Sequence, residues 1–263
     1  MGISAASPTA AAGSPGSGSI WSAILSRLST SDPDSRGPQF RFYGRRKGKP
    51  LKPNRQALLD QVLPKLLIGE AAVARDPRAL FQHAPQDIWL EVGFGGGEHL
   101  AAQATANPVA GIIGCEVFLN GVASLVRHVD ERKLNNVRVW HGDVRELLPN
   151  LPDGSIARVF VLYPDPWPKA RHAKRRLIGP DSLPELARIL ADGGELRFAS
   201  DHPVYVRWAL QHLTAAPEFH WQARTPEDWR TRPADQIETR YEAKAKTAGR
   251  TPSYLTFLRR PRA

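Results

Sequence analysis

From about residue 88 onward, hydrophobic residues form short continuous runs that alternate with amphipathic stretches. Runs of aliphatic, β-branched and aromatic residues predict strands at 88–92, 111–115, 137–140, 157–162 and 195–199. Helical periodicity predicts helices at 98–106, 121–134, 183–190 and 203–213. Strands that alternate with helices form parallel β-α-β units with right-handed crossovers. The pattern therefore predicts an α/β fold with helices on both faces of the sheet.

Two later runs, at 218–223 and 253–259, are not joined by a clear crossover helix that would pair them in parallel. We expect them to close one edge of the sheet as antiparallel strands. Together with the five parallel strands, they predict a seven-stranded mixed sheet.

The N-terminal part of the chain has a different composition. Of residues 1–19, 16 are Ala, Ser, Gly or Pro, which bury too little apolar surface to offset chain entropy. We expect residues 1–35 to be a disordered, low-complexity tail. Residues 36–55 hold eight Lys and Arg, no acid and several aromatic residues. This segment is typical of an arm that follows a phosphate backbone, and also of a solvated linker whose aromatic residues dock on the domain at 56–263; the two interpretations are compatible.

The net charge of +10 and the pI of about 10.1 favour a polyanionic partner. A single cysteine excludes an internal disulfide framework and favours the cytoplasm. No apolar run approaches the roughly 18–20 residues of a membrane span, and the histidines show no spacing typical of metal ligands. We therefore expect no membrane and no metal.

The first predicted strand leads into a glycine-rich turn, in the sequence WLEVGFGGGEHL at 89–100. Glycines between a buried strand and a helix allow the backbone to approach a ligand closely. The glycines at Gly93, Gly95 and Gly97 do not match the G-x-G-x-x-G dinucleotide fingerprint, and no Gly-Lys-Ser/Thr follows them. The turn therefore predicts a cofactor loop without a dinucleotide or P-loop signature.

Carboxylates lie at the ends of three successive strands: Glu91, Glu116 and Asp143. Glu116 is placed to accept hydrogen bonds from ribose hydroxyls, and Asp143 to reach an adenine amino group. Each acid alone is equally typical of a solvated strand end or a helix cap. All three around a glycine loop favour a cofactor site, and the missing phosphate fingerprint favours S-adenosylmethionine.

The fourth strand leads into YPDPWPKARHAKRR, residues 163–176. Prolines of fixed φ flank Asp165, which suits a side chain that must point at a substrate beside the cofactor. Trp167 either stacks on a base or packs against the domain. Closely spaced cations repel one another unless an anion lies among them, and phosphates are the natural anion. We therefore expect RNA-phosphate contacts from Arg171, Lys174, Arg175 and Arg176.

These segments together resemble the tRNA (guanine-N7)-methyltransferase family, through EVGFGGGEHL, GCEVF, PDPWPKARHAKRR, ASD at 199–201 and TRYE at 239–242. The resemblance covers about residues 40–260 and implies a class I, Rossmann-like methyltransferase fold. It implies a cofactor site for S-adenosylmethionine that includes Glu91, Gly93, Gly95, Glu116, Asp143 and Asp165. It also implies substrate contacts from Lys169, Asp201, Thr239, Arg240, Tyr241 and Glu242.

Two positions depart from the family pattern. Ser200 stands where threonine is expected, and Arg240-Tyr241 stands where Lys-Phe is common. The TRYE segment is also typical of a capping box, with Thr239 as the N-cap and Glu242 at N3.

The expected reaction is methylation of guanine N7 in the variable loop of tRNA. N7 is an acceptor on the major-groove edge and needs no general base. Asp165 is the expected catalytic residue, because it would hold the base as positive charge develops. The alternatives are a methyltransferase for another base, a nucleic-acid-binding module with a degenerate cofactor site, and a nicotinamide oxidoreductase. The set of tRNAs and the oligomeric state, monomer or homodimer, stay open.

Overall fold

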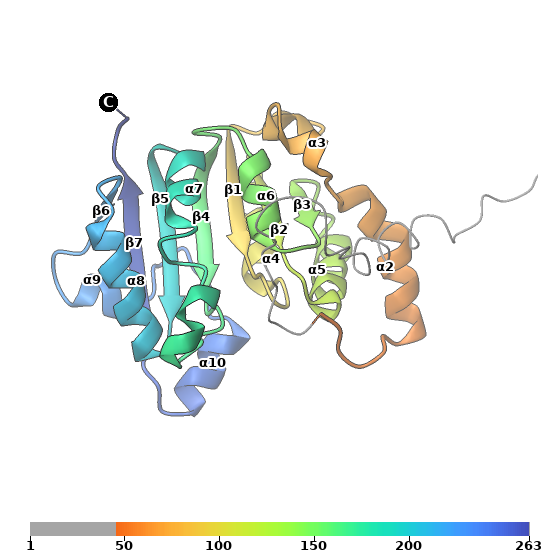
Figure 1. The fold of residues 1–263 in the computed structure, drawn as a ribbon. Coiled ribbons are helices and arrows are strands. Elements are labelled where there is room, and N and C mark those ends of the chain that lie inside the picture. Colours follow the sequence, from red (N-terminus) through yellow and green to blue (C-terminus); the bar gives the residue numbers. More distant parts are fainter. Residues whose placement is uncertain (1–45, 263) are drawn as a thin grey trace, which may run out of the picture. The chain divides into compact units, whose positions relative to one another are not determined.

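The computed structural model describes residues 46–262. The predicted tail and residues 36–45 of the predicted basic arm lie outside this range. The described residues form a seven-stranded mixed sheet with the order β3-β2-β1-β4-β5-β7-β6 (Figure 1). The strands are β1 (Asp87–Val92), β2 (Ala110–Cys115), β3 (Val137–Trp140), β4 (Ile156–Leu162), β5 (Leu190–Ser200), β6 (Phe219–Trp221) and β7 (Ser253–Arg259).

Strands β1 to β5 run parallel, whereas β7 pairs antiparallel with both β5 and β6. This arrangement confirms the predicted mixed sheet and its antiparallel edge. The starts and ends of the first four strands agree with the prediction to within a residue. Strand β5 begins at Leu190, five residues before the predicted start, and its pairing with β4 shifts register between Ile156 and Arg158. This part of the strand contains a polar turn around Gly193, where φ is +77°, so it lacks the apolar run that predicts a strand.

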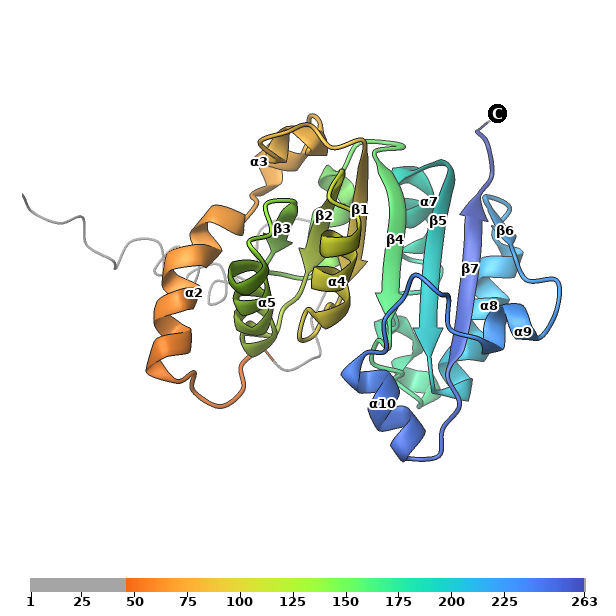
Figure 2. The ribbon, with the colours of Figure 1, turned by 180° about the vertical axis from the view of Figure 1, so that it is seen from behind.

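Helices cover both faces of the sheet (Figures 1 and 2). One face carries α2 (Pro53–Leu66), α4 (Glu98–Ala106) and α5 (Leu119–Arg132). The other carries α6 (Val144–Leu147), α7 (Leu183–Ile189) and α8 (Pro203–Ala215). The remaining helical segments are α3 (Glu70–Val73), η1 (Pro77–Leu80), η2 (Leu148–Asn150), η3 (Ala170–Arg175), α9 (Glu227–Arg230) and α10 (Arg240–Thr247).

Helix α2 begins at Pro53, inside the predicted basic arm at 36–55. Pro53 occupies the first turn, where its missing N–H costs nothing and its fixed φ suits a helix. Leu59, Leu63 and Leu66 are buried at helical spacing, and α2 packs against α5. The apolar spacing after Pro53 is the sequence signal for this helix.

Residues 46–49 dock on the start of α5. Leu119 N donates to Arg46 O at 3.0 Å. The Asn120 side chain accepts from Gly48 N and donates to Lys49 O, both at 2.8 Å. The aromatic residues whose docking the linker interpretation predicts lie outside the described residues, so both interpretations of the basic segment stay predictions.

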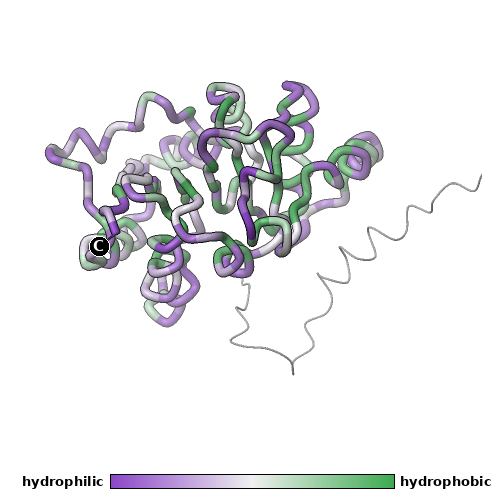
Figure 3. The backbone as a smooth tube through the Cα atoms, turned by 90° about the horizontal axis from the view of Figure 1, so that it is seen from above, coloured by the Kyte–Doolittle hydropathy of each residue, from purple (hydrophilic) through white to green (hydrophobic). Residues whose placement is uncertain are grey.

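The core lies between the sheet and its helices. All six residues of β2 are buried, which explains why the parallel strands read as continuous apolar runs. Hydrophobic positions follow the central strands, while hydrophobic and hydrophilic positions alternate along the helices (Figure 3). Within residues 46–262, no helix combines the length and the apolar character that a bilayer crossing requires.

The strand order reverses direction at β1 and β4. The chain proceeds from β1 to β2 and β3 on one side, and from β4 to β5 on the other. In open α/β sheets, ligands bind outside the carboxyl ends of the strands at such a switch point. The fold therefore positions a ligand site at the carboxyl ends of β1 and β4.

Candidate active site

A pocket of about 450 Å³ lies at this switch point. Its walls come from the segments that follow β1, β2, β3 and β4, and from α10. The sequence-predicted residues that line it are Gly93, Gly95, Glu116, Asp143, Asp165, Arg175 and Tyr241. The sequence-predicted site residues that do not line the pocket are Glu91, Lys169, Arg171, Lys174, Arg176, Asp201, Thr239, Arg240 and Glu242.

The glycine loop after β1 requires its glycines. Gly93, Gly95 and Gly97 have φ values of +69°, +56° and +77°, a region that side chains other than glycine rarely adopt. Gly93 N donates to Cys115 O at 2.8 Å, which holds the loop on β2. A Cβ on Gly121 of α5 would lie 2.2 Å from Gly95 O, so α5 packs directly against the loop backbone.

Glu116 follows β2 and fastens the same loop. One carboxylate oxygen accepts from Gly95 N at 2.8 Å, and the other accepts from Val117 N and Phe118 N at 2.8 and 2.9 Å. Burial raises the pKa of the Glu116 carboxyl, and the three N–H groups oppose this effect in part. A carboxylate offers about four acceptor sites, which leaves about one for a ligand hydroxyl.

Asp143 follows β3 and caps α6. Its carboxylate accepts from Arg145 N at 3.0 Å and from the Arg145 guanidinium at 3.0 and 2.5 Å. The helix-cap alternative therefore describes what Asp143 does in this structure. Asp143 and Arg145 still line the pocket together, and a ligand amino group there would compete with the guanidinium for the carboxylate.

Glu91 lies in the body of β1 and faces α4. Its Oε2 is 2.8 Å from His99 Nδ1, and both side chains are buried. His99 Nε2 lies 3.3 Å from Gln103 Nε2, so the pair continues into α4. Glu91 thus joins β1 to the helix that begins after the glycine loop, and supports the loop from behind.

The loop after β4 is strained at both ends. Strand β4 ends at Leu162, and Tyr163 and Trp167 have φ values of +51° and +41°. Left-handed backbone costs residues with a side chain roughly 1–2 kcal/mol each. Between them, Asp165 is exposed and lines the pocket. Within residues 46–262, no hydrogen bond or ion pair involves the Asp165 carboxylate, so it is available to a ligand.

The basic residues after this loop divide into three groups. Lys169, Arg171 and Lys174 are exposed, the latter two on η3. The Arg175 guanidinium lies 4.8 Å from the Trp167 ring centroid, in the pocket wall. Arg176 is buried, with only 7% of its surface exposed. The structure thus separates five neighbouring cations into surface residues, a pocket residue and an interior residue.

Helix α10 closes one side of the pocket. Thr239 caps it, with Oγ1 accepting from Glu242 N at 3.2 Å, which confirms the predicted N-cap. Tyr241 lies on the glycine loop, because a Cβ on Gly95 would be 2.9 Å from the Tyr241 ring. Arg240 pairs with Glu98 of α4 at 3.3 Å. The helix that Thr239 caps therefore places the side chains of Arg240 and Tyr241 beside the glycine loop that follows β1.

Glu242 faces the interior rather than the pocket. Its Oε1 accepts from the Tyr254 hydroxyl at 2.7 Å and from Lys246 and Arg232 at 2.9 and 3.2 Å. Burial and Glu242 raise the pKa of Tyr254 to about 12. Burial also raises the pKa of Tyr163, beside the same cluster. Glu242 therefore joins α10 to β7.

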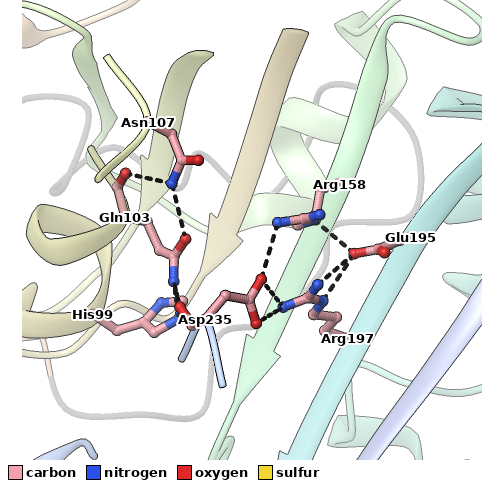
Figure 4. Close-up of polar contacts among 7 residues, drawn as sticks. All are labelled: His99, Gln103, Asn107, Arg158, Glu195, Arg197 and Asp235. Atoms are coloured by element: carbon pink, nitrogen blue, oxygen red, sulfur yellow. Dashed lines mark hydrogen bonds and ion pairs between the residues drawn. The ribbon is translucent and has the colours of Figure 1, made fainter. Parts of the chain in front are cut away.

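A polar network ties the segment before α10 to the sheet (Figure 4). Both oxygens of Asp235 lie 2.7 Å from Arg197 Nη1, and Gln103 Nε2 donates to Asp235 O at 2.5 Å. Glu195 pairs with Arg158 at 2.7 Å and with Arg197 at 2.8 Å. The network fixes the chain shortly before the N-cap of α10.

Asp201 lies after β5 and pairs with Arg250 at 2.5 Å. It lines a second pocket, of about 570 Å³, between α8, α9 and the start of β7. The structure thus brings Asp201 to the carboxyl edge of the sheet but outside the pocket that contains Asp165.

Other lining residues had no distinctive sequence signal, because they are ordinary strand-end or loop residues. They include Phe118, Gly142, Arg145, Tyr163 and Leu177. Among the described residues, no group of three or more His, Cys, Asp or Glu side chains is placed to hold a metal ion.

Residues 85–254 match a family model described as a putative methyltransferase. The tRNA (guanine-N(7)-)-methyltransferase of Rhodospirillum rubrum is 57% identical over 235 residues, which cover 88% of this chain and 92% of that protein. The protein of the same name from Paramagnetospirillum magneticum is 55% identical over 225 residues, covering 84% and 94%. A solved structure of the 16S rRNA methyltransferase KamB aligns with a TM-score of 0.48 at 17% identity, covering 67% of this chain and 89% of that one.

Proposed function

The chain belongs to the tRNA (guanine-N(7)-)-methyltransferase family, and we propose that it transfers a methyl group from S-adenosylmethionine to N7 of a guanine in the variable loop of tRNA. One observation carries the geometric part of the proposal. Asp165, with no partner among residues 46–262, lines the same pocket as Glu116 and the glycine loop. A group that holds the base therefore lies beside the groups that would hold the cofactor.

The residues of the pocket fit S-adenosylmethionine. A volume of about 450 Å³ lies in the usual range of small-molecule sites. Glu116 has an acceptor site for a ribose hydroxyl, and Gly93 and Gly95 let the cofactor approach the backbone. The Asp143 carboxylate is paired with Arg145, so the carboxylates of Glu116 and Asp165 are the ones that favour a cation over a phosphate in the pocket. This charge suits a ligand that carries a sulfonium and an ammonium group.

S-adenosylmethionine supplies a methyl group on a sulfonium sulfur, and its transfer to N7 leaves a neutral thioether and a positively charged guanine ring. Asp165 would accept hydrogen bonds from guanine N1–H and the 2-amino group. These bonds strengthen as the ring becomes positive, so the carboxylate stabilises the transition state more than the ground state. Much of the acceleration would come from positioning the two reactants.

The reaction requires no general base, because guanine N7 carries a lone pair and no proton. The pocket agrees with this requirement, since no His or Lys from the described residues lines it. Tyr163 and Tyr241 do line it, but burial raises the pKa of both hydroxyls and makes them poor bases at neutral pH.

The tRNA would approach over the loop after β4. Lys169, Arg171 and Lys174 are exposed beside that loop and would contact backbone phosphates. Trp167 lines the pocket beside Asp165 and would contact the base there. A cytoplasmic location, where tRNA is found, is part of the same proposal.

The test is methyl transfer from labelled S-adenosylmethionine to unmodified tRNA transcripts, followed by digestion to nucleosides. We expect N7-methylguanosine, absent when the variable-loop guanine is replaced by adenine. Asp165→Ala should lower kcat by about 100-fold or more at saturating cofactor. Label on another base would assign a different target to the same fold. Failure of the wild-type protein to bind S-adenosylmethionine would overturn the proposal, and near wild-type turnover of Asp165→Ala would overturn the role of Asp165.

A further inference from the structure

Arg176 is the last cation of the basic run after β4, and its sequence context resembles that of a phosphate contact. We infer instead that Arg176 is a positioning residue, which holds the loop from Pro164 to Trp167 in the shape that presents Asp165 to the pocket. The inference rests on the proposed function for its kinetic consequences, but its structural basis stands without it.

The Arg176 guanidinium binds the loop backbone directly after Asp165. Its Nε donates to Pro166 O at 3.0 Å, and its Nη2 donates to Trp167 O at 2.8 Å. Two donors of one rigid, planar group thus hold two consecutive carbonyls. Since the side chain is 93% buried, it has little surface left for an RNA phosphate.

The guanidinium is held in turn by helix α8. It lies 4.8 Å from the Trp208 ring centroid and 5.8 Å from that of Tyr205. Trp208 Nε1 donates to Ile178 O at 2.6 Å, and the Tyr205 hydroxyl accepts from Ile178 N at 3.1 Å. The two rings are therefore fixed to the same chain segment that carries Arg176, and they form a rigid aromatic support for it.

The loop needs an external donor because it has few donors of its own. Pro164, Pro166 and Pro168 lack an N–H group. Tyr163 and Trp167 are in the left-handed region, and such a backbone persists only where its surroundings fix it. Arg176 supplies the donors from outside the loop, and its two bonds lie at the strained end that follows Asp165.

The kinetic test compares Arg176→Lys with Arg171→Ala. Lysine keeps the charge but lacks the planar fork, so Arg176→Lys should lower kcat about 10- to 100-fold, with the KM values for tRNA and cofactor within about threefold of wild type. Arg171 is exposed on η3, and Arg171→Ala should raise the KM for tRNA. If Arg176→Lys instead retained kcat and raised the KM for tRNA, Arg176 would be a phosphate contact and the inference would be wrong.

A structural readout separates this inference from the proposed function. The protein is labelled with 5-fluorotryptophan, and the Trp167 signal is assigned by its loss in Trp167→Phe. In ¹⁹F spectra, Arg176→Lys should shift or broaden the Trp167 signal, whereas Arg132→Ala, at the exposed end of α5, should leave it unchanged. An unchanged signal in Arg176→Lys would overturn the inference even if tRNA methylation is confirmed. If the wild type does not methylate tRNA, the spectra still decide whether Arg176 holds the loop.

Arg176→Lys could fail to fold, since the side chain is interior. Trp208→Phe is the second variant, because it keeps a ring under the guanidinium but loses the bond to Ile178 O. It should show the same pattern as Arg176→Lys with a smaller loss of kcat, about threefold to tenfold. An unchanged kcat and an unchanged Trp167 signal in this variant would contradict the inference.

Discussion

Burial and hydrogen bonding act on the Glu116 carboxyl in opposite directions. Burial raises its pKa, and the N–H groups of Phe118, Gly95 and Val117 lower it, with burial the larger effect. The backbone N–H donors on both oxygens favour the ionised form of the side chain and so oppose the effect of burial. Ionisation of Glu116 therefore strengthens its hydrogen bond to Gly95 in the glycine loop and any hydrogen bond that it accepts from a ribose hydroxyl.

The pH dependence of cofactor affinity follows from this raised pKa. The ionised form accepts from the loop and from ribose, so affinity is complete above the folded-state pKa and declines as the pH falls through it. We expect the Kd for S-adenosylmethionine, measured by titration calorimetry from neutral to acidic pH, to rise as the pH falls and to begin rising above the usual titration range of a glutamate. Glu116→Gln should bind more weakly and lose this dependence. A wild-type Kd that stays constant over this range would contradict the assignment.

The sequence predicted the positions of some site residues correctly and of others not. Glu116 follows the end of β2 and Asp143 follows the end of β3, so both reach the pocket as predicted. Glu91 is still within β1, where side chains point to the faces of a sheet, and it faces α4. Arg175 and Arg176 are identical in type, and only the end of η3 between them directs one to the pocket and one inward.

At the scale of elements, the contact between α5 and the glycine loop determines where the loop lies. Gly121 belongs to the first turn of α5 and has Gly95 O over its Cα. The close approach is possible because glycine has no Cβ. The helix thus fixes the loop that the cofactor would touch.

Gly121→Ala should weaken cofactor binding although it favours the helix. Alanine for glycine in a helix normally stabilises by roughly 0.5–1 kcal/mol. Here the new Cβ would lie 2.2 Å from a backbone oxygen, so the loop must move. We expect an affinity loss of about tenfold or more and no gain in Tm. Gly69→Ala is the matched control, since no atom lies within 4 Å of its Cβ position. Equal affinities for the two variants would disprove the role of this contact.

The polar network in Figure 4 fixes the position of the segment that leads into α10. Asp235 links the segment before α10 to β5 through Arg197 and to α4 through Gln103. The position of Tyr241 over Gly95 depends on where that segment lies.

Asp235→Ala should loosen α10 while the sheet stays folded. Removing a carboxylate bonded to a mostly buried Arg197 costs about 1–3 kcal/mol, so we expect Tm to fall by several degrees. Amide hydrogen exchange should accelerate over 231–247 and stay unchanged in β1 to β4. Asp76→Ala, at an exposed cap far along the chain, is a control that should leave exchange at 231–247 unchanged. Uniformly faster exchange would show general destabilisation rather than a local effect.

Elements with strong patterns were predictable, and those set by long-range contacts were not. The parallel strands are buried on both faces, so their apolar runs mark them clearly. Helix α2 was not predicted, because the basic charge around it masks the spacing of Leu59, Leu63 and Leu66. The early start of β5 depends on pairing with Ile156, which no local pattern shows.

For the whole molecule, the net charge of +10 should govern tRNA affinity through salt. Each phosphate contact contributes roughly 0.7–0.9 to the slope of log K against log salt. The double variant Arg171→Ala, Lys174→Ala should reduce the magnitude of that slope by about 1–2, as measured by filter binding or anisotropy. Arg132→Ala, at the exposed end of α5, should leave the slope unchanged. If both variants change it equally, charge acts globally and not through η3.

Strand β7 lies between β5 and β6, although β6 precedes it in the chain. On the ribosome, β6 therefore emerges with no neighbour to pair with, and β5 presents an open edge until β7 arrives. Open edges invite pairing with other chains, so this interval is when the nascent protein most needs protection. When this interval begins, β1 to β4 and the glycine loop have been made, whereas α10 with Tyr241 is made during it. The protein thus acquires the parts that would hold its cofactor before it acquires the part that covers them.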